Sequence, residues 1–220
     1  MLGVYGGTFD PVHFGHLRTA FEVAETLGLE RVHMIPCHVP PHRGEPTASP
    51  AQRRDMMALA LAGQSRLVLD TRELDRPGPS YMVDTLASLR SEFGEDVPLC
   101  LILGRDALAG LPGWHRWRRL TELAHLVVMA RPQAPGRLPA DLEAHLAGRE
   151  ARDRRELAGA PAGRLLSCSV TQLDISSTHI RALLRGGRSP RYLLPDPVLD
   201  VILQQGLYRT ERNGSSQNLS

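Results

Sequence analysis

The residues best suited to chemistry lie near the N-terminus, in the run Gly6-Gly7-Thr8-Phe9-Asp10-Pro11-Val12-His13-Phe14-Gly15-His16. Glycines let a ligand approach the backbone closely, and imidazoles three residues apart share one face of a helical turn. A short apolar run at 2–5 precedes these residues, and apolar residues at helical spacing follow at 17–27. The start of a helix offers unpaired N–H groups and the positive end of the helix dipole. The spacing therefore predicts a phosphate site between a strand and a helix.

A second run with the same character lies near the C-terminus, at Asp174-Ile175-Ser176-Ser177-Thr178-His179-Ile180-Arg181. Its hydroxyl groups are typical of a helix N-cap, and an arginine in the first turns offers a planar fork for phosphate oxygens. Between the two runs, an apolar strand at 99–103 ends in Gly104-Arg105-Asp106. We expect these polar loops to converge on one ligand.

Composition excludes several classes of protein. The 26 basic residues, all arginine, balance 24 acidic ones, so the net charge of +2 does not predict binding to nucleic acid. A chain without lysine has neither a Walker-type phosphate loop nor a Schiff-base mechanism. No Gly-x-Gly-x-x-Gly follows the first strand, which disfavours a dinucleotide-binding dehydrogenase. His13 and His16 lack the i, i+4 spacing and the glutamate of a zinc protease motif.

Strands and helices alternate along the chain, which predicts an α/β fold with a doubly wound parallel sheet. In such a sheet, ligands bind beyond the carboxyl ends of the strands where the strand order reverses, commonly between the first and fourth strands. Two helices carry start signals: Ser49 with Pro50 and Gln52, and Ser80 ahead of an apolar stripe. The expected strands are 2–5, 31–36, 67–69, 99–103, 126–129 and 165–170.

We interpret 1–210 as a single domain with a surface insertion at 133–163, and 211–220 as a disordered tail. The longest apolar runs have strand length and the N-terminus lacks a leader pattern, so we expect a soluble, cytoplasmic protein away from membranes. Three widely spaced cysteines indicate neither a disulfide framework nor a cysteine zinc site. Two of them, Cys100 and Cys168, are expected to pack as small apolar residues in strands.

Taken together, the two hydroxyl- and histidine-bearing runs resemble the (His/Thr)-x-Gly-His and Ile-Ser-Ser-Thr-x-Ile-Arg motifs of the nucleotidyltransferase superfamily of adenylyltransferases. More of the chain is similar to bacterial nicotinate-nucleotide adenylyltransferases, at Pro79-Ser80-Tyr81, Gly104-Arg105-Asp106, Trp114, Arg131-Pro132 and Gly206-Leu207-Tyr208. The resemblance implies a Rossmann-like nucleotidyltransferase fold. It also implies transfer of the adenylyl group of ATP to nicotinate mononucleotide in NAD biosynthesis, giving deamido-NAD and pyrophosphate by in-line attack without a covalent intermediate.

The resemblance also implies roles for individual residues. The catalytic residues would be His13, His16 and Arg181. ATP and its phosphates would be bound by Gly6, Gly7, Thr8, Phe9, His42, Arg43, Gly104, Asp106, Ser176, Ser177 and Thr178. Nicotinate mononucleotide would be bound by Ser80, Tyr81, Met82, Trp114, His115 and Arg131. Mg²⁺ is the expected cofactor, held mainly by ATP phosphates and water, with no metal ligand assigned to the protein.

Other interpretations stay open. Within the same reaction class, the acceptor would be nicotinamide mononucleotide or phosphopantetheine. In another class, the fold would serve as a noncatalytic nucleotide sensor. We favour a ligand contact for Trp114, core packing for Trp117, and a turn or capping role for Asp10 instead of that of a base. The sequence leaves a homo-oligomer open.

Overall fold

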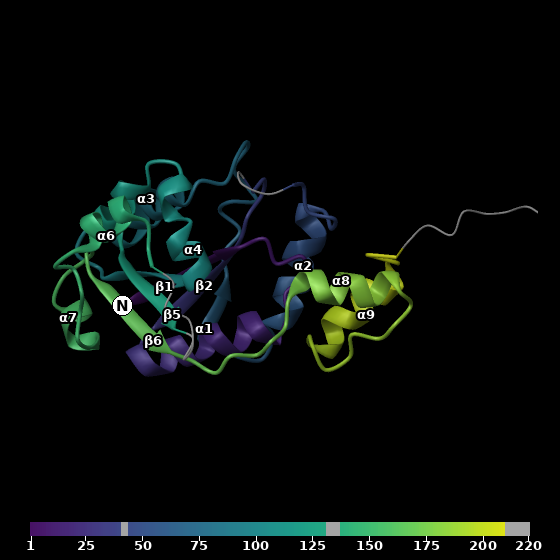
Figure 1. Ribbon diagram of the computed structural model, residues 1–220. Helices are drawn as coiled ribbons and strands as arrows, with labels where there is room; N and C mark the ends of the chain where they lie inside the picture. Colours follow the sequence, from purple (N-terminus) through teal and green to yellow (C-terminus); the bar gives the residue numbers. More distant parts are fainter. Residues whose placement is uncertain (41–43, 131–136, 210–220) are drawn as a thin grey trace, which may run out of the picture.

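Six parallel strands form the centre of the computed structural model, which describes residues 1–40, 44–130 and 137–209 (Figure 1). The strands are β1 (Leu2–Gly7), β2 (Arg31–Pro36), β3 (Leu67–Leu69), β4 (Leu99–Gly104), β5 (His125–Ala130) and β6 (Leu165–Ser169). Their order in the sheet is β3-β2-β1-β4-β5-β6, so the chain reverses direction across the sheet between β1 and β4. The doubly wound sheet and its predicted reversal point are confirmed.

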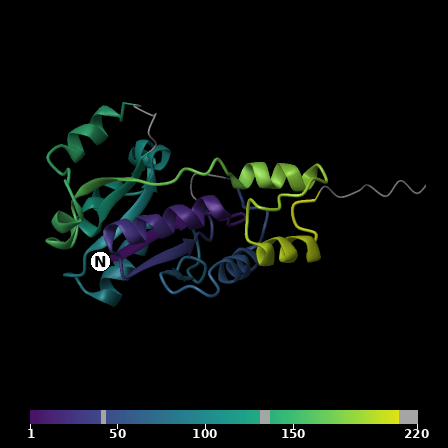
Figure 2. The ribbon, with the colours of Figure 1, turned by 90° about the horizontal axis from the view of Figure 1, so that it is seen from below.

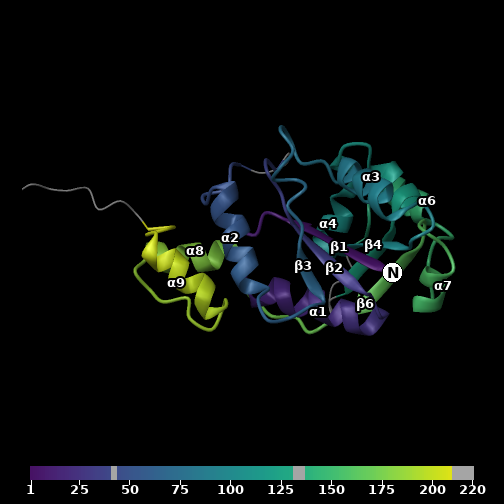
Figure 3. The same cartoon turned by 180° about the vertical axis from the view of Figure 1, so that it is seen from behind.

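Helices connect these strands and cover both faces of the sheet (Figures 1 and 3). The longer ones are α1 (Phe14–Leu27), α2 (Pro50–Ala60), α3 (Met82–Phe93), α8 (Ser177–Arg185) and α9 (Asp196–Gln204). The shorter ones are α4 (Arg105–Ala109), α5 (Leu120–Leu123), α6 (Ala140–Leu146) and α7 (Arg154–Ala158), with 3₁₀ turns at Leu111–Gly113 and Trp117–Arg119. Within the described residues, we find no helix of the length and apolarity that crossing a bilayer requires.

Local end signals explain where several helices begin and end. Ser49 and Gln52 form the predicted capping box before α2, and Gly28 takes the left-handed conformation that ends α1. The prediction that Ser80 caps α3 is wrong, because Tyr81 is the N-cap residue and makes no side-chain cap hydrogen bond. The hydroxyl of Ser80 instead accepts a hydrogen bond from the backbone N–H of His38, at 2.8 Å.

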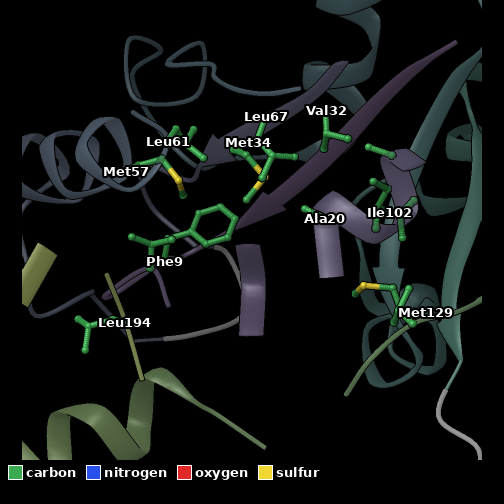
Figure 4. Packing of buried hydrophobic residues seen from close by; sticks show 14 of the residues in the cluster. Phe9, Ala20, Val32, Met34, Met57, Leu61, Leu67, Ile102, Met129 and Leu194 are labelled. Carbon is green, nitrogen blue, oxygen red and sulfur yellow. The ribbon is translucent and has the colours of Figure 1, made fainter. Parts of the chain in front are cut away.

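Two apolar cores lie on opposite faces of the sheet because side chains alternate along each strand. In β4, Cys100 and Ile102 face the core beneath α1, whereas Leu99, Leu101 and Leu103 face the core beneath α3. Cys100 and Cys168 are buried in their strands, as expected. Figure 4 shows the first core, in which the ring of Phe9 lies near Met57 and Met34.

The segment interpreted as a surface insertion is tied into this framework. Leu142 and Leu146 of α6 are buried in the second core, and Leu157 of α7 is buried in the first. Residues 133–136 of that segment and the tail at 211–220 lie outside the described residues.

The helices α8 and α9 form a lobe that extends beyond the end of the sheet (Figures 1 and 2). Its nearest neighbour is α2, against which α9 packs. Buried residues of α8 and α9, including Ile180, Val198 and Ile202, continue the first core into the lobe. The lobe therefore lies next to the carboxyl end of β1, where the first predicted site begins.

Candidate active site

Two cavities meet at the carboxyl ends of β1 and β4. We call the first, of about 480 Å³, the tryptophan cavity, which is lined by Cys37, Glu73, Ser80, Tyr81, Met82, Trp114 and His115 among others. We call the second, of about 690 Å³, the histidine cavity, which is lined by Phe9, His13, His16, Thr47, Ile175, Ser176, Ser177, Thr178 and Arg181 among others. Both are also lined by Tyr5, Gly6, Gly7, Thr8, Gly104, Asp106 and Ala107. The glycine-rich end of β1 is thus a wall common to both cavities.

Close packing constrains the two glycines of this wall, Gly7 more than Gly6, because Gly6 faces the movable end of the Met82 side chain whereas Gly7 faces the buried ring of Phe9. A Cβ atom on Gly6 would lie 2.5 Å from Cε of Met82, and one on Gly7 would lie 2.9 Å from Cζ of Phe9. Phe9 itself has a positive φ of 48° and is 2% exposed. Its ring fills the core beneath the loop, so at this position the backbone, and not the side chain, is what a ligand would meet.

The imidazoles of His13 and His16 stack on each other, with ring centroids 3.7 Å apart and an interplanar angle of 23°. His13 is the N-cap residue of α1 and His16 lies in its first turn, as the spacing predicts. Gly15 makes room for this pair, because a Cβ atom there would come within 3.0 Å of the His13 ring and 3.4 Å of the Ile175 carbonyl oxygen. The segment just before α8, which contains Ile175, therefore passes directly over the start of α1.

Burial lowers the pKa of His13 to about 4, and burial together with the neighbouring His13 lowers the pKa of His16 well below its ordinary value. Both rings are therefore neutral at pH 7 and carry one N–H each. The Nδ1 atoms of both are buried without a hydrogen-bond partner in the part of the chain that the structure describes. A neutral imidazole can donate its one N–H to an anion.

The start of α8 brings a cation and hydroxyl groups to the same cavity. Arg181 donates from Nη1 to the Asp10 carbonyl oxygen at 2.6 Å, and a second contact joins its Nη2 to Thr178 Oγ1 at 3.4 Å. Ser176 caps α8 by accepting from the N–H of His179, and Ser177 donates to the carbonyl oxygen of Pro11. The two predicted phosphate segments are thus joined by hydrogen bonds that span 166 and 171 residues of sequence.

Aromatic side chains shape the tryptophan cavity. Tyr81 and His115 lie with their rings 4.4 Å apart, and Trp114 lines the same space. Trp117 is 7% exposed and packs in the second core, which confirms the role expected for it. Ser80 and Met82, at the start of α3, also line this cavity.

Asp106 lies in the first turn of α4 and, with Gly104, borders both cavities. The predicted binding residues His42, Arg43 and Arg131 lie outside the described residues. Their roles, like the ligand contacts of the other site residues, stay predictions.

Sequence reasoning missed Arg53, whose guanidinium is fully buried next to the loop at 8–13 between β1 and α1, which we call the phosphate loop. It donates to four carbonyl oxygens, those of Thr8, Cys37, His38 and Ala48. A signal was present, since Arg53 shares the buried face of α2 with Met56 and Met57 at i+3 and i+4.

Sequence reasoning also missed Glu73, which is 3% exposed in the tryptophan cavity and had no such signal because it lies in a loop. Burial raises its pKa, and Thr85 donates a hydrogen bond to it.

The hydrogen-bond donors of the histidine cavity suit an anion that arrives with its own bound cation. Over residues 1–40, 44–130 and 137–209, no three His, Cys, Asp or Glu side chains gather closely enough to hold a metal ion. The cavity presents neutral imidazoles, hydroxyl groups and a guanidinium, together with the separate carboxylates of Asp10, Glu45 and Asp106. A Mg²⁺ ion bound by phosphate oxygens and water fits this arrangement, because Mg²⁺ commonly keeps several waters in nucleotide sites.

Comparison with known proteins adds the family. Residues 4–183 match the cytidylyltransferase-like family model. Proteins named "Probable nicotinate-nucleotide adenylyltransferase" from Methylococcus capsulatus and Halorhodospira halophila are 54% and 50% identical to this chain. Each alignment covers 94% of this chain, with 99% and 94% of the respective relative. The structure of a Plasmodium falciparum nicotinic acid mononucleotide adenylyltransferase complexed with NaAD superposes with a TM-score of 0.70 at 14% identity. That alignment covers 94% of this chain and 96% of the other, and it shows the shared fold.

Proposed function

The chain belongs to the cytidylyltransferase-like family, within its nicotinate-nucleotide adenylyltransferases, and from this premise we propose how its two cavities transfer the adenylyl group of ATP to nicotinate mononucleotide. The reaction gives deamido-NAD and pyrophosphate and belongs to NAD biosynthesis. The observation that carries the proposal is the wall at Gly6 and Gly7 that the two cavities share. A nucleotide in each cavity brings its phosphates to the same glycines.

We assign the triphosphate of ATP to the histidine cavity and nicotinate mononucleotide to the tryptophan cavity. The pyridine ring would stack on Trp114, a flat apolar face next to Tyr81 and His115. Its carboxylate would meet backbone N–H groups near Met82 and His115, and the N-terminus of α3 favours a negative charge there. Asp106, which borders both cavities, would contact a ribose.

The bond changes need little acid–base chemistry from the protein. An oxygen of the mononucleotide phosphate attacks the α-phosphorus of ATP in line, and the bond from that phosphorus to the β-phosphate oxygen breaks. The nucleophile is already an oxyanion, so positioning and charge stabilisation supply most of the acceleration. His13 and His16 would donate to α- and β-phosphate oxygens, and Arg181 would hold the β- and γ-phosphates.

Charge builds up on the leaving pyrophosphate as the bond breaks. Buried, neutral imidazoles that donate at this point stabilise the transition state more than the ground state. The bound Mg²⁺ would neutralise phosphate charge and orient the triphosphate.

The cytoplasmic location expected from the sequence stays a prediction.

The test is release of pyrophosphate from ATP with nicotinate mononucleotide, compared with nicotinamide mononucleotide and phosphopantetheine at equal concentrations. We expect turnover to be fastest with nicotinate mononucleotide. Faster turnover with either rival acceptor would identify that acceptor as the substrate in place of nicotinate mononucleotide. Binding of ATP without pyrophosphate release for any acceptor would contradict catalysis and favour a nucleotide sensor.

A further inference from the structure

Asp10 lines the histidine cavity, and its buried carboxylate is hydrogen-bonded on both oxygens. Oδ2 accepts from the N–H of Thr47 at 2.8 Å. Oδ1 accepts from the N–H of Ala48 at 3.1 Å and from the hydroxyl of Tyr208 at 2.7 Å. Asp10 is 4% exposed, so these partners replace the water that an ionised carboxylate needs. This satisfied anion is unsuited to be a base but well suited to hold other groups in place.

Asp10 also fixes Arg181 in two ways. Its backbone carbonyl oxygen accepts from Nη1 of Arg181 at 2.6 Å, and its Oδ2 lies 3.9 Å from the same nitrogen. These contacts use one side of the guanidinium and set the direction of its plane. The side chain of Arg181 keeps 23% of its surface exposed and lines the histidine cavity.

The partners of Asp10 come from three parts of the chain that are far apart in sequence. Thr47 and Ala48 precede α2, Arg181 lies on α8, and Tyr208 follows α9. The helices α8 and α9 make up the lobe that extends beyond the sheet (Figure 2). Tyr208 is 5% exposed, and its hydroxyl reaches Asp10 from the segment that follows α9.

We propose that Asp10 is a positioning residue for ATP, and that its hydrogen bond to Tyr208 is a latch that holds the C-terminal lobe against the phosphate loop so that Arg181 points at the triphosphate. The proposal rests on the assignment of the triphosphate to the histidine cavity. Without the Tyr208 hydroxyl, the lobe keeps its apolar contacts but loses the polar contact that fixes its distance from Asp10. Arg181 is then held less firmly for phosphate.

The test is Tyr208→Phe, which removes one oxygen and keeps the buried ring. We expect the KM for ATP to rise about tenfold, the range for losing a hydrogen bond to a charged group, while the KM for nicotinate mononucleotide changes less than about twofold. Tyr192→Phe is the matched control, because Tyr192 also lies in the C-terminal region with a positive φ but is 83% exposed. It should leave both constants unchanged.

The second part of the test uses Arg181→Ala. If the latch acts through Arg181, adding Tyr208→Phe to Arg181→Ala causes no further loss of ATP affinity. Losses that multiply in the double variant would overturn the proposal. So would an unchanged KM for ATP in Tyr208→Phe, or equal rises in both KM values.

Circular dichroism verifies that each variant is folded at the assay temperature. If Tyr208→Phe is not folded, Asp10→Asn is measured against the same criteria, since it keeps one acceptor oxygen and loses the charge facing Arg181. Calorimetric titration with ATP separates the two proposals. A wild-type chain that binds ATP without turnover contradicts the proposed function, and the tenfold change in ATP Kd still decides the latch.

Discussion

His13 and His16 are set apart from the other histidines by how closely they are buried against each other. Their rings stack at 3.7 Å, and burial keeps both neutral at neutral pH. Protonating either ring would place a cation in a buried site beside the other ring. Bound phosphate would accept hydrogen bonds from this pair, whose buried Nδ1 atoms have no partner among the described residues. These two side chains are therefore poised as donors whose contribution appears only with an anion present.

Replacing His16 tests that contribution. His16→Ala should lower kcat by about two decades or more while ATP affinity changes only a few-fold, since its contact strengthens as charge moves to the leaving group. Pyrophosphate release and calorimetric ATP binding give the two quantities. His179→Ala, at an exposed position on α8, is the control and should keep its activity. A kcat near that of the unsubstituted chain would exclude the role of His16.

The same burial makes stability depend on pH. The pKa of His13 is about 4 in the folded protein because of burial, against an ordinary value of 6.5. Between these values the unfolded chain binds more protons, so the free energy of unfolding rises with pH and is lost as pH falls from 6.5 towards 4. For His13 the loss is on the order of 2 kcal/mol. Urea unfolding of wild type and His13→Gln across this range measures the difference, and parallel curves would contradict the prediction.

At the scale of elements, Arg53 connects the segments that carry the site. From α2 it reaches carbonyl oxygens after β1, after β2 and just before its own helix. These carbonyl groups belong to loops, which have no sheet or helix partner for them. One buried cation thus satisfies several orphaned acceptors and fixes the loops against each other.

Removing Arg53 should therefore destabilise the whole protein. Arg53→Ala leaves four buried acceptors unsatisfied and should reduce the free energy of unfolding by about 3 kcal/mol or more. Arg54→Ala is the neighbouring control, because Arg54 is half-exposed and pairs with Asp55, and it should change stability by less than about 0.5 kcal/mol. Denaturant unfolding compares the two. A loss for Arg53→Ala as small as that for Arg54→Ala would rule out this bracing role.

For the whole molecule, β4 unites two cores that lie on opposite faces of one sheet. Leu101 and Ile102, neighbours in sequence, are both buried, and each belongs to a different core. A strand shared in this way couples the stability of the two faces. The C-terminal lobe joins the same unit through α2 and Asp10.

This coupling predicts a single unfolding transition. Leu101→Ala and Ile102→Ala should each cost about 2–5 kcal/mol, and each should shift tryptophan fluorescence and far-ultraviolet circular dichroism together. Trp114 and Trp117 report on the second core, whereas circular dichroism reports on the whole chain. Leu203→Ala, at a 41% exposed position, should cost little. Separate transitions for the two signals would show that the cores unfold independently.

The sequence by itself determined those features of the fold that depend on residues close together in the chain. The capping box at Ser49, the end of α1 at Gly28 and the apolar run of β4 follow from local hydrogen bonding and periodicity, and the structure confirms each one. The motifs around His13 and Arg181 likewise indicated the reaction class, which the relatives support. Such patterns are readable because helices and strands repeat over a few residues.

Only the tertiary structure decided which distant groups meet. Serine is a residue type typical of helix caps, yet the hydroxyl of Ser80 accepts a hydrogen bond from the backbone N–H of His38, 42 residues away. The contact of Asp10 with Tyr208 spans 198 residues, and the four acceptors of Arg53 come from two loops, one after β1 and one between β2 and α2. The neutral state of His13 and His16 also depends on burial by the folded chain. Long-range hydrogen bonds and desolvation depend on distance in space, for which a linear sequence has no local signal.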